Sequence, residues 1–171
     1  ITGLPISNML APAFWRSMQL GIVAMIISTG TGVPLGLVAA AKRDTWIDSL
    51  ITGVGYIGVS IPSFVSATLM LLLLASPPFE LFPTGGYAKL NQGFVPWLKH
   101  LLLPALSLNF VAFGYVMRQT RGAMIETLES NYIRTARLKG LSERKILTKH
   151  ALRNGLLPTI TILAFNFGWM M

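Results

Sequence analysis

The sequence contains no cysteine, which excludes disulfide bonds and thiolate metal sites anywhere in the chain. Acidic residues are also scarce, since six Asp and Glu stand against 14 Lys and Arg. Charged residues of either sign make up 12% of the chain, whereas soluble domains carry roughly 25%. Two long segments, residues 17–41 and 49–79, hold no charge at all. A chain that excludes charge over such lengths is expected to lie in a lipid bilayer.

Four apolar segments are predicted to cross the membrane: residues 17–41, 50–75, 101–117 and 156–171. At about 1.5 Å per residue, a helix over the first segment reaches roughly 37 Å, which exceeds a hydrocarbon core of about 30 Å. Apolar core helices of soluble proteins are usually shorter, at roughly 10–14 residues. We therefore predict an all-α fold, a polytopic transmembrane helical bundle of about four spans that forms a single transmembrane domain over residues 1–171. Both ends of the chain look cut from a longer protein.

The basic residues predict which connections face the cytoplasm. Residues 118–153 hold nine Lys and Arg but only three acids, and residues 42–49 add two more basic residues. These two connections lie on the same side of an alternating bundle, and Lys and Arg accumulate in cytoplasmic loops. We therefore expect residues 42–49 and the loop 118–155 to be cytoplasmic. The Pro- and Gly-rich connection 76–100 is expected to face outward.

Helix breakers occur inside the first two predicted spans. Pro34 and Pro62 each remove one backbone hydrogen bond from a helix, which favours a kink or a hinge at that point. Hinged helices that line a pathway and ordinary packing kinks explain these prolines equally well. Gly32 and Gly36 form a small-xxx-small pair, a pattern typical of closely packed membrane helices.

Motifs of enzyme chemistry are absent or out of context. Residues 53–58 match the dinucleotide-binding pattern G-x-G-x-x-G, with Glu80 further on, but the glycines lie in an uncharged run without a preceding strand signal. Helix packing explains them better. His100 and His150 fall on opposite predicted sides, so they cannot share a metal ion. No catalytic triad, paired carboxylates or phosphate loop is present, so we expect no catalytic, cofactor or metal site.

The basic loop has internal order. Asn131 is expected to cap a short helix that ends at Gly140, and Ser142 is expected to cap a second helix over residues 143–153. This arrangement resembles a helix-turn-helix DNA reader, or a loop that lies on anionic lipid, but the flanking spans argue against DNA. The small residues Ala136 and Gly140 instead favour close approach of a docking partner, with the basic residues steering an acidic surface.

At this level of detail the sequence resembles a known family. Residues 132–145 and 149–158 resemble the cytoplasmic loop of ABC importer permeases, and the similarity is greatest to the first permease subunit of the dipeptide/oligopeptide/nickel type. Pro34-Leu35-Gly36, residues 61–64 and residues 82–86 resemble the same branch. One departure is that Arg134-Thr135-Ala136 stands where the broad importer pattern has Glu-Ala-Ala.

The resemblance implies a membrane-spanning subunit that forms half of a translocation pathway in a prokaryotic inner membrane, surrounded by lipid. It implies a second homologous permease subunit, two ATPase subunits that hydrolyse the ATP, and an extracytoplasmic substrate-binding protein as partners, and no nucleic acid. Peptide is the leading substrate, with nickel chelates or other small solutes as alternatives. The alternative function is a membrane-anchored regulator whose loop binds nucleic acid or anionic lipid.

The resemblance also implies that residues 132–140 form a coupling helix seated in a groove of the ATPase. The residues expected to make this contact, by fit or by charge, are Arg134, Ala136, Arg137, Lys139, Gly140 and Ser142. Pro34 and Pro62 are the expected helix hinges. Compared with a full family member, the chain is expected to lack a first and a last span.

Overall fold

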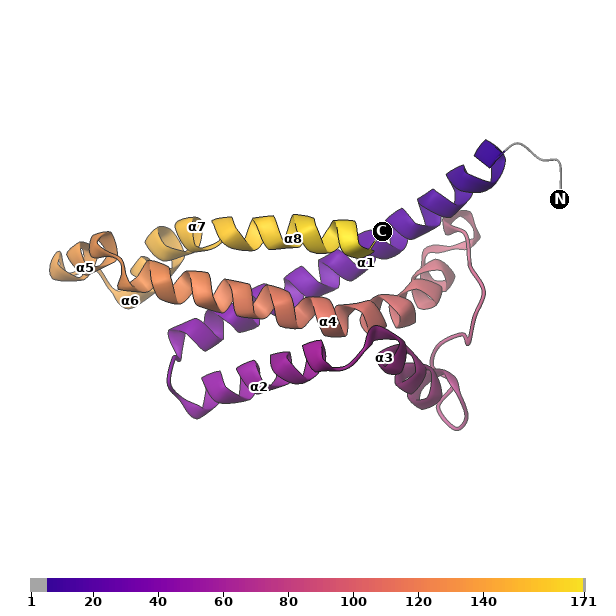
Figure 1. Cartoon of the computed structure of the whole chain (residues 1–171), viewed down its shortest axis with the longest axis horizontal. Coiled ribbons are helices and arrows are strands. Elements are labelled where there is room, and N and C mark those ends of the chain that lie inside the picture. Colours follow the sequence, from indigo (N-terminus) through magenta and orange to yellow (C-terminus); the bar gives the residue numbers. More distant parts are fainter. Residues whose placement is uncertain (1–5, 171) are drawn as a thin grey trace.

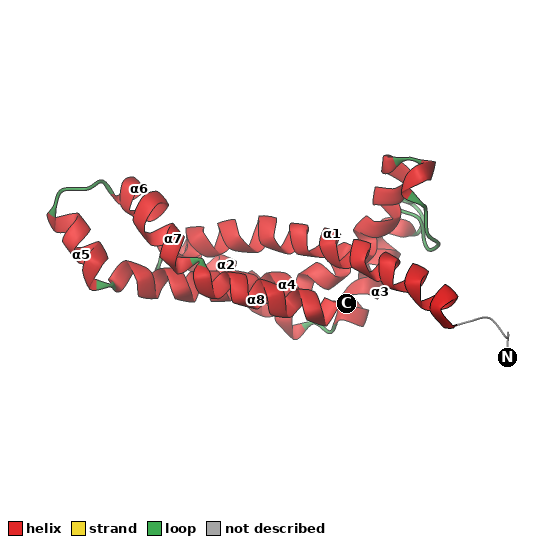
Figure 2. Ribbon diagram, turned by 90° about the horizontal axis from the view of Figure 1, so that it is seen from above, coloured by secondary structure: helices red, strands yellow, loops and turns green. Residues whose placement is uncertain are grey.

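A computed structural model describes the backbone of residues 6–170 and the side chains of residues 10–170. Within residues 6–170 the chain forms helices and no strand (Figure 2), so the predicted all-α class is confirmed. The α-helices are α1 (Ile6–Ala41), α2 (Trp46–Ser60), α3 (Ser63–Met70), α4 (Phe94–Glu129), α5 (Asn131–Leu138), α6 (Glu143–Lys145), α7 (Leu152–Gly155) and α8 (Leu157–Met170). Two π-helical turns, η1 (Leu71–Ala75) and η3 (Ile146–Ala151), and the 3-10 turn η2 (Leu90–Gln92) complete the set.

The fold is an elongated bundle arranged around α4 (Figure 1). Helices α1, α2, α3 and α8 all contact α4, and α1 runs along much of its length. One end of the bundle carries the projecting segment α5–α7, and the other end carries the irregular connection between η1 and α4. The two ends therefore correspond to the predicted cytoplasmic and outer sides.

The predicted spans need correction in their boundaries. Helices α1 and α4 are long and apolar enough to cross a membrane, and both extend well beyond the predicted segments 17–41 and 101–117. Residues 118–129, which the sequence assigned to the loop, continue α4. This stretch has no proline and a single glycine, so nothing ends the helix where the charges begin. The charged residues from Arg118 onward mark the edge of the apolar segment, but they do not end α4.

The predicted second span is not one straight helix. Helix α2 and the α3–η1 segment meet at an angle of 100°, so together they form either a broken span or a re-entrant loop. Helix α8, within the predicted fourth span, has 14 residues and is too short to count as a span by itself. The described chain thus has two clear spanning helices, or three if the bent pair crosses the membrane.

The two prolines behave differently. Pro34 lies inside α1, and the helix continues through it. At Pro62 the chain bends, because a residue before proline disfavours the helical region and Ile61 accordingly has extended dihedral angles (φ −87°, ψ 119°). The Pro62 carbonyl then accepts the first hydrogen bond of α3, from the Val65 N–H at 2.9 Å. The backbone is thus bent at Pro62, and a hinge motion at either proline stays a prediction.

Glycines allow α1 to approach α4 closely. A Cβ at Gly36 would lie 2.7 Å from both the Met117 carbonyl oxygen and the Thr120 Cβ, and a Cβ at Gly32 would lie 2.9 Å from a Val116 methyl group. These separations are far below van der Waals contact, so a larger residue at either position would push the helices apart. The predicted role of the Gly32/Gly36 pair in close helix contact is confirmed.

The glycine-rich motif 53–58 serves the same purpose on the other side of α4. It lies within α2, and a Cβ at Gly58 would lie 2.5 Å from the Phe110 carbonyl oxygen. Gly114 of α4 is opposite Gly55, whose carbonyl oxygen and the Val59 side chain occupy the space of a Cβ there. The reading of this motif as helix packing is confirmed at Gly55 and Gly58.

This packing predicts the effect of adding one methyl group to α4. We expect Gly114→Ala to destabilise the full-length protein by about 1–3 kcal/mol, because the new Cβ would overlap the backbone of α2. Gly122→Ala is the matched control, since a Cβ at Gly122 on the same helix meets nothing within 4 Å. Thermal unfolding in detergent measures both. An equal transition temperature for the two variants would contradict the packing described for α2 and α4.

Candidate functional site

The predicted docking loop folds into two short helical segments that return the chain from α4 to α8. The first, α5, begins after Ser130, whose backbone is extended (φ −67°, ψ 152°), so Ser130 and not Asn131 is the N-cap residue. At its other end Gly140 has a φ of +76°, a conformation that glycine adopts without strain. The Gly140 N–H bonds the Arg137 carbonyl at 2.9 Å and the Leu141 N–H bonds the Ala136 carbonyl at 3.3 Å. These two bonds form the Schellman stop that the sequence predicted at Gly140.

The second segment begins after Ser142 and runs without a break through α6, η3 and α7 to Gly155. The predicted helix 143–153 is thus present, with a wider π-helical turn in its middle. Ser142 occupies the N-cap position with extended dihedral angles, although its hydroxyl makes no capping hydrogen bond. Each end of the loop continues directly into a bundle helix.

The loop packs as one body on the end of α4. Ile133 and Ala136 point inward from α5 and are buried, with exposed fractions of 0% and 8%. They join Met124 of α4 with Ile146 and Ala151 of the second segment in one apolar cluster. Ala136 lies three residues after Ile133 and so on the same helix face. The Ala136 side chain thus packs against the chain itself, and its part in the ATPase contact stays a prediction.

Arg137 braces the loop internally. Its guanidinium donates to both carboxylate oxygens of Glu143, at 2.8 and 3.3 Å, and to the Leu128 carbonyl at 3.3 Å. The hydrogen bonds from Arg137 lower the pKa of Glu143 below its usual value of 4.5, and those to Glu143 raise the pKa of Arg137. The pair is therefore intact above pH 4.5 and is lost as the pH falls through the lowered pKa. The hydrogen bonds of Arg137 are thus made within the loop and to the end of α4.

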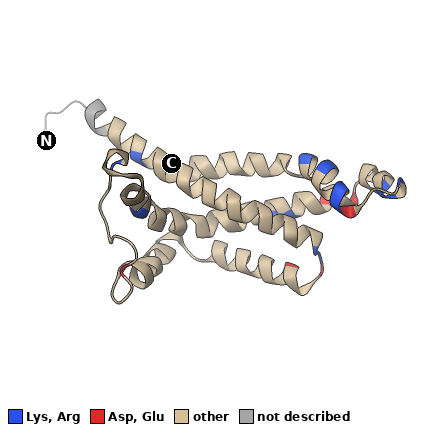
Figure 3. Cartoon of the chain, turned by 180° about the vertical axis from the view of Figure 1, so that it is seen from behind, with Lys and Arg blue, Asp and Glu red and all other residues tan. Residues whose placement is uncertain are grey.

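The remaining predicted contact residues lie on the surface. Arg134, Lys139, Gly140 and Ser142 are all exposed. Beside them stands Leu138, which the sequence reasoning missed and which is 82% exposed. No distinct signal in the sequence marks this leucine, because the same charged loop also contains other large apolar residues, among them Ile133, Leu141 and Ile146. Figure 3 shows the basic residues gathered at this end of the molecule.

A buried ion pair at the inner end of the bundle was also missed. Arg121 of α4 donates through Nε and Nη2 to the two carboxylate oxygens of Asp48 in α2, each at 2.6 Å. The Asp48 side chain is 6% exposed and also accepts hydrogen bonds from Thr52 Oγ1 and the Asp44 N–H, both at 3.1 Å. This bidentate geometry clamps α2 to α4 just below the apolar region. In the sequence, Asp48 directly precedes the uncharged run 49–79, and Arg121 follows the apolar run 101–117 by a few residues. This similar placement at the ends of two spans was the signal for an ion pair.

Further polar contacts tie the neighbouring helices to the same end of α4. Arg43, after α1, pairs with Glu129. In the interior, the hydroxyl groups of Thr120 and Thr159 lie 3.2 Å apart and join α4 to α8. All three flanking helices are thus held where α4 enters the loop. Within residues 6–170, no three His, Asp or Glu side chains converge in a way that could hold a metal ion.

Comparison with known proteins establishes the family. Residues 32–171 match the binding-protein-dependent transport system inner membrane component family, and the chain belongs to it. The predicted kinship with ABC importer permeases and the inner-membrane location are thereby confirmed.

Several relatives are similar over nearly the whole chain. A relative from Brucella abortus (strain 2308), named as a peptide transport system permease protein, is 36% identical over 98% of this chain and 53% of its own length. The dipeptide transport system permease protein DppB of Escherichia coli (strain K12) is 31% identical over 98% of this chain and 56% of its own length. The chain therefore spans about half the length of these relatives.

The buried ion pair leads to a second prediction. We expect Asp48→Asn to destabilise the full-length protein by about 1–3 kcal/mol, because it leaves the partly buried Arg121 guanidinium, whose side chain is 27% exposed, without its counter-charge. Asp44→Asn is the control, since the Asp44 side chain is 84% exposed and surface pairs contribute less than about 1 kcal/mol.

Guanidinium denaturation or thermal unfolding in detergent gives the comparison. Adding Arg121→Gln to the Asp48→Asn variant should recover part of the loss, because the unpaired charge is then removed. The Arg121→Gln variant alone completes the comparison. If the losses of stability in the two single variants add up to the loss in the double variant, the two side chains do not interact.

Proposed function

We propose that this chain is the central part of a permease subunit of an ATP-driven importer for peptides or similar small solutes. In this proposal the loop 130–153 receives the motion of separate ATPase subunits. The family and the names of the relatives support the transport class. Because the chain spans about half of those relatives, the activity, substrate and partners of the whole protein are part of the proposal.

The observation that carries the proposal is the build of the loop. Its inner side is an apolar core fused to the end of α4, and its outer side presents Leu138 with Arg134 and Lys139. An exposed apolar residue ringed by cations is a typical anchor for a partner surface that is apolar at its centre and acidic at its rim. We therefore assign the ATPase contact to this outer side of α5, and Ala136 and Arg137 to the support behind it.

The same geometry supplies a path for the motion. A push on α5 meets a packed cluster and passes into α4, which α5 follows with only Ser130 between them. From α4 it reaches α2 through the Asp48–Arg121 pair and the glycine contacts, and α8 through the second loop segment. Closely packed helices move together because their contacts resist deformation. The ATPase dimer would thus rock the bundle as a unit.

The partners in this proposal are a second permease subunit, two ATPase subunits and an extracytoplasmic substrate-binding protein. Peptide is the proposed substrate, since relatives from several organisms are named for peptide or dipeptide transport. The rival function, a regulator that binds nucleic acid or anionic lipid through the loop, gains no support from the packing, because the loop continues directly into α4 and α8 of the bundle.

Leu138→Asp tests the proposal. We expect it to reduce substrate uptake and co-purification of the ATPase by about tenfold or more, because central apolar anchors each contribute about 2 kcal/mol or more to binding. Thr148→Asp is the control, because Thr148 is an exposed position on the second loop segment. The assay uses the full-length subunit in its complete transporter, reconstituted in vesicles. Normal uptake by the Leu138→Asp protein would refute the proposed contact.

A further inference from the structure

A hydrogen-bonded network fixes the outer end of α1 against the outer connection. The Gln19 side-chain oxygen accepts one hydrogen bond from the Tyr87 hydroxyl at 3.0 Å and another from the Trp97 indole N–H at 2.9 Å. Both acceptor positions of that oxygen are thus used. These residues come from α1, the outer connection and α4, so the network holds three segments in one geometry.

This network orients a cation. The Arg16 guanidinium carbon lies 4.9 Å from the centre of the Tyr87 ring, within the range of a cation–π contact. Because Gln19 holds the Tyr87 hydroxyl, the ring is a fixed platform for the guanidinium. A stacked guanidinium keeps its N–H groups in the plane, where they remain able to donate to a further ligand.

Arg16 and a second cation border the same hollow. A cavity of about 470 Å³ is lined by Trp15, Arg16, Gln19, Tyr87, Lys89 and Asn91, together with Pro12 and Leu90. Its polar lining consists of two cations, two amides and a phenol, and none of these groups carries negative charge. Such a lining matches an anion with several acceptor oxygens.

No carboxylate of the chain is placed to neutralise these cations. None of the ion pairs in the described part of the chain includes Arg16 or Lys89. Residues 1–43 contain no acid, and Glu80 is the only acid between Asp48 and Glu126. The outer end thus carries three cations, Arg16, Lys89 and Lys99, against the single acid Glu80, and an external anion would lower the energy of this excess positive charge.

The position of the hollow relative to the membrane indicates which anion it would bind. Arg16 directly precedes the uncharged run 17–41, so it lies at the boundary of the apolar region. Trp15 at the rim is 60% exposed, and tryptophan prefers the level of the lipid headgroups. Lipid phosphates are concentrated at this level, whereas soluble anions are dilute.

We propose that Arg16 and Lys89 form a binding site for the phosphodiester group of an anionic lipid at the outer end of α1. Arg16 donates to the phosphate oxygens from its platform on Tyr87, and Lys89 supplies the second charge from the outer connection. The acyl chains of the lipid would extend along the apolar surface below Trp15. The site is independent of the transport proposal, since it needs only this end of the bundle.

Lipid retention by the full-length subunit in its native complex tests the site. The complex is incorporated into bilayers of phosphatidylcholine with a minor fraction of phosphatidylglycerol, extracted, and its bound lipids are measured by native mass spectrometry. We expect Arg16→Gln combined with Lys89→Gln to lower phosphatidylglycerol retention roughly 10- to 30-fold, the effect of losing two basic contacts at a membrane surface. Arg16→Lys should retain most of the lipid.

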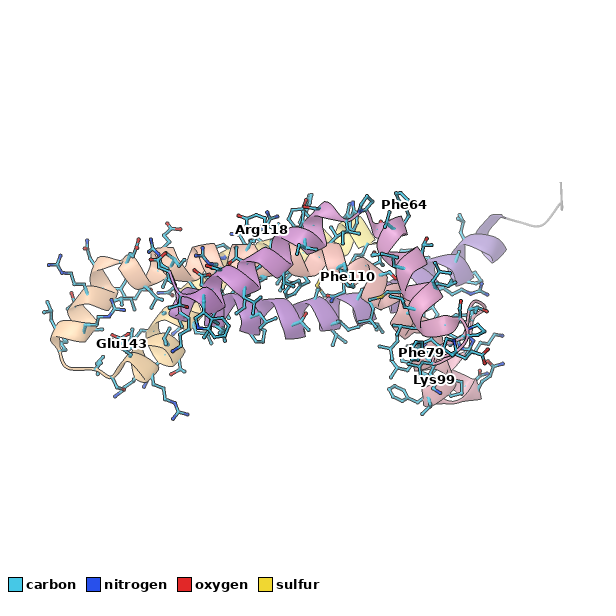
Figure 4. All side chains as sticks on the ribbon, turned by 90° about the horizontal axis from the view of Figure 1, so that it is seen from below. Phe64, Phe79, Lys99, Phe110, Arg118 and Glu143 are labelled. Atoms are coloured by element: carbon cyan, nitrogen blue, oxygen red, sulfur yellow. The ribbon has the colours of Figure 1, made fainter. Side chains whose placement is uncertain are left out.

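Lys99→Gln is the matched control, because Lys99 is an exposed cation at the same end of the molecule but outside the hollow (Figure 4). It should retain phosphatidylglycerol like the unchanged protein. An equal loss with Lys99→Gln would assign the effect to diffuse charge and overturn the site. Unchanged retention in the double variant would overturn it as well. Displacement of the lipid by millimolar inorganic phosphate would show a free-phosphate site and refute the lipid assignment.

Discussion

The close contact of two helices with α4 is the constraint on which the rest of this structure depends. Where Gly36 and Gly58 face α4, a single added Cβ would come within 2.7 Å of its atoms. In a bilayer, where water does not drive apolar helices together, such contact is the main source of helix association. The glycines therefore decide which faces of α1 and α2 meet α4. They also bring Asp48 within hydrogen-bonding reach of Arg121.

That ion pair and the loop complete a mechanical unit at the inner end. The pair fixes α2 to α4 where the glycine contacts end, and the apolar cluster around Ile133 fixes α5 to the same helix. The bundle is thus rigid at the end that carries the basic loop. At the other end α3 departs from α2 at 100°, and an irregular connection held by Gln19 closes the structure. In the proposed function the first end receives the motion of the ATPase, and in the proposed lipid site the second end meets the membrane headgroups.

The sequence predicts the helical class and the Gly32/Gly36 contact because each depends on residue type and spacing alone. It predicts Gly140 as a stop because only glycine adopts its positive φ without strain. It does not show which way Ala136 points, because the apolar face that Ile133 and Ala136 share on α5 could meet either a partner or the chain itself. It also misses the Asp48–Arg121 pair, whose members are distant in sequence and meet only after α2 has packed. The sequence also places the end of α4 too early. The first charged residues mark where the apolar, membrane-spanning part of α4 ends, but the helix itself continues to Glu129.

The absence of cysteine makes one measurement especially direct. A single cysteine introduced as Ser142→Cys, in the full-length subunit co-expressed with its ATPase, would be tested for crosslinking to that ATPase in membranes. The account predicts a crosslink whose yield changes with ATP, because Ser142 lies exposed beside the proposed contact face. Free labelling of this cysteine from outside intact cells, without a crosslink, would place the loop on the wrong side and contradict the account.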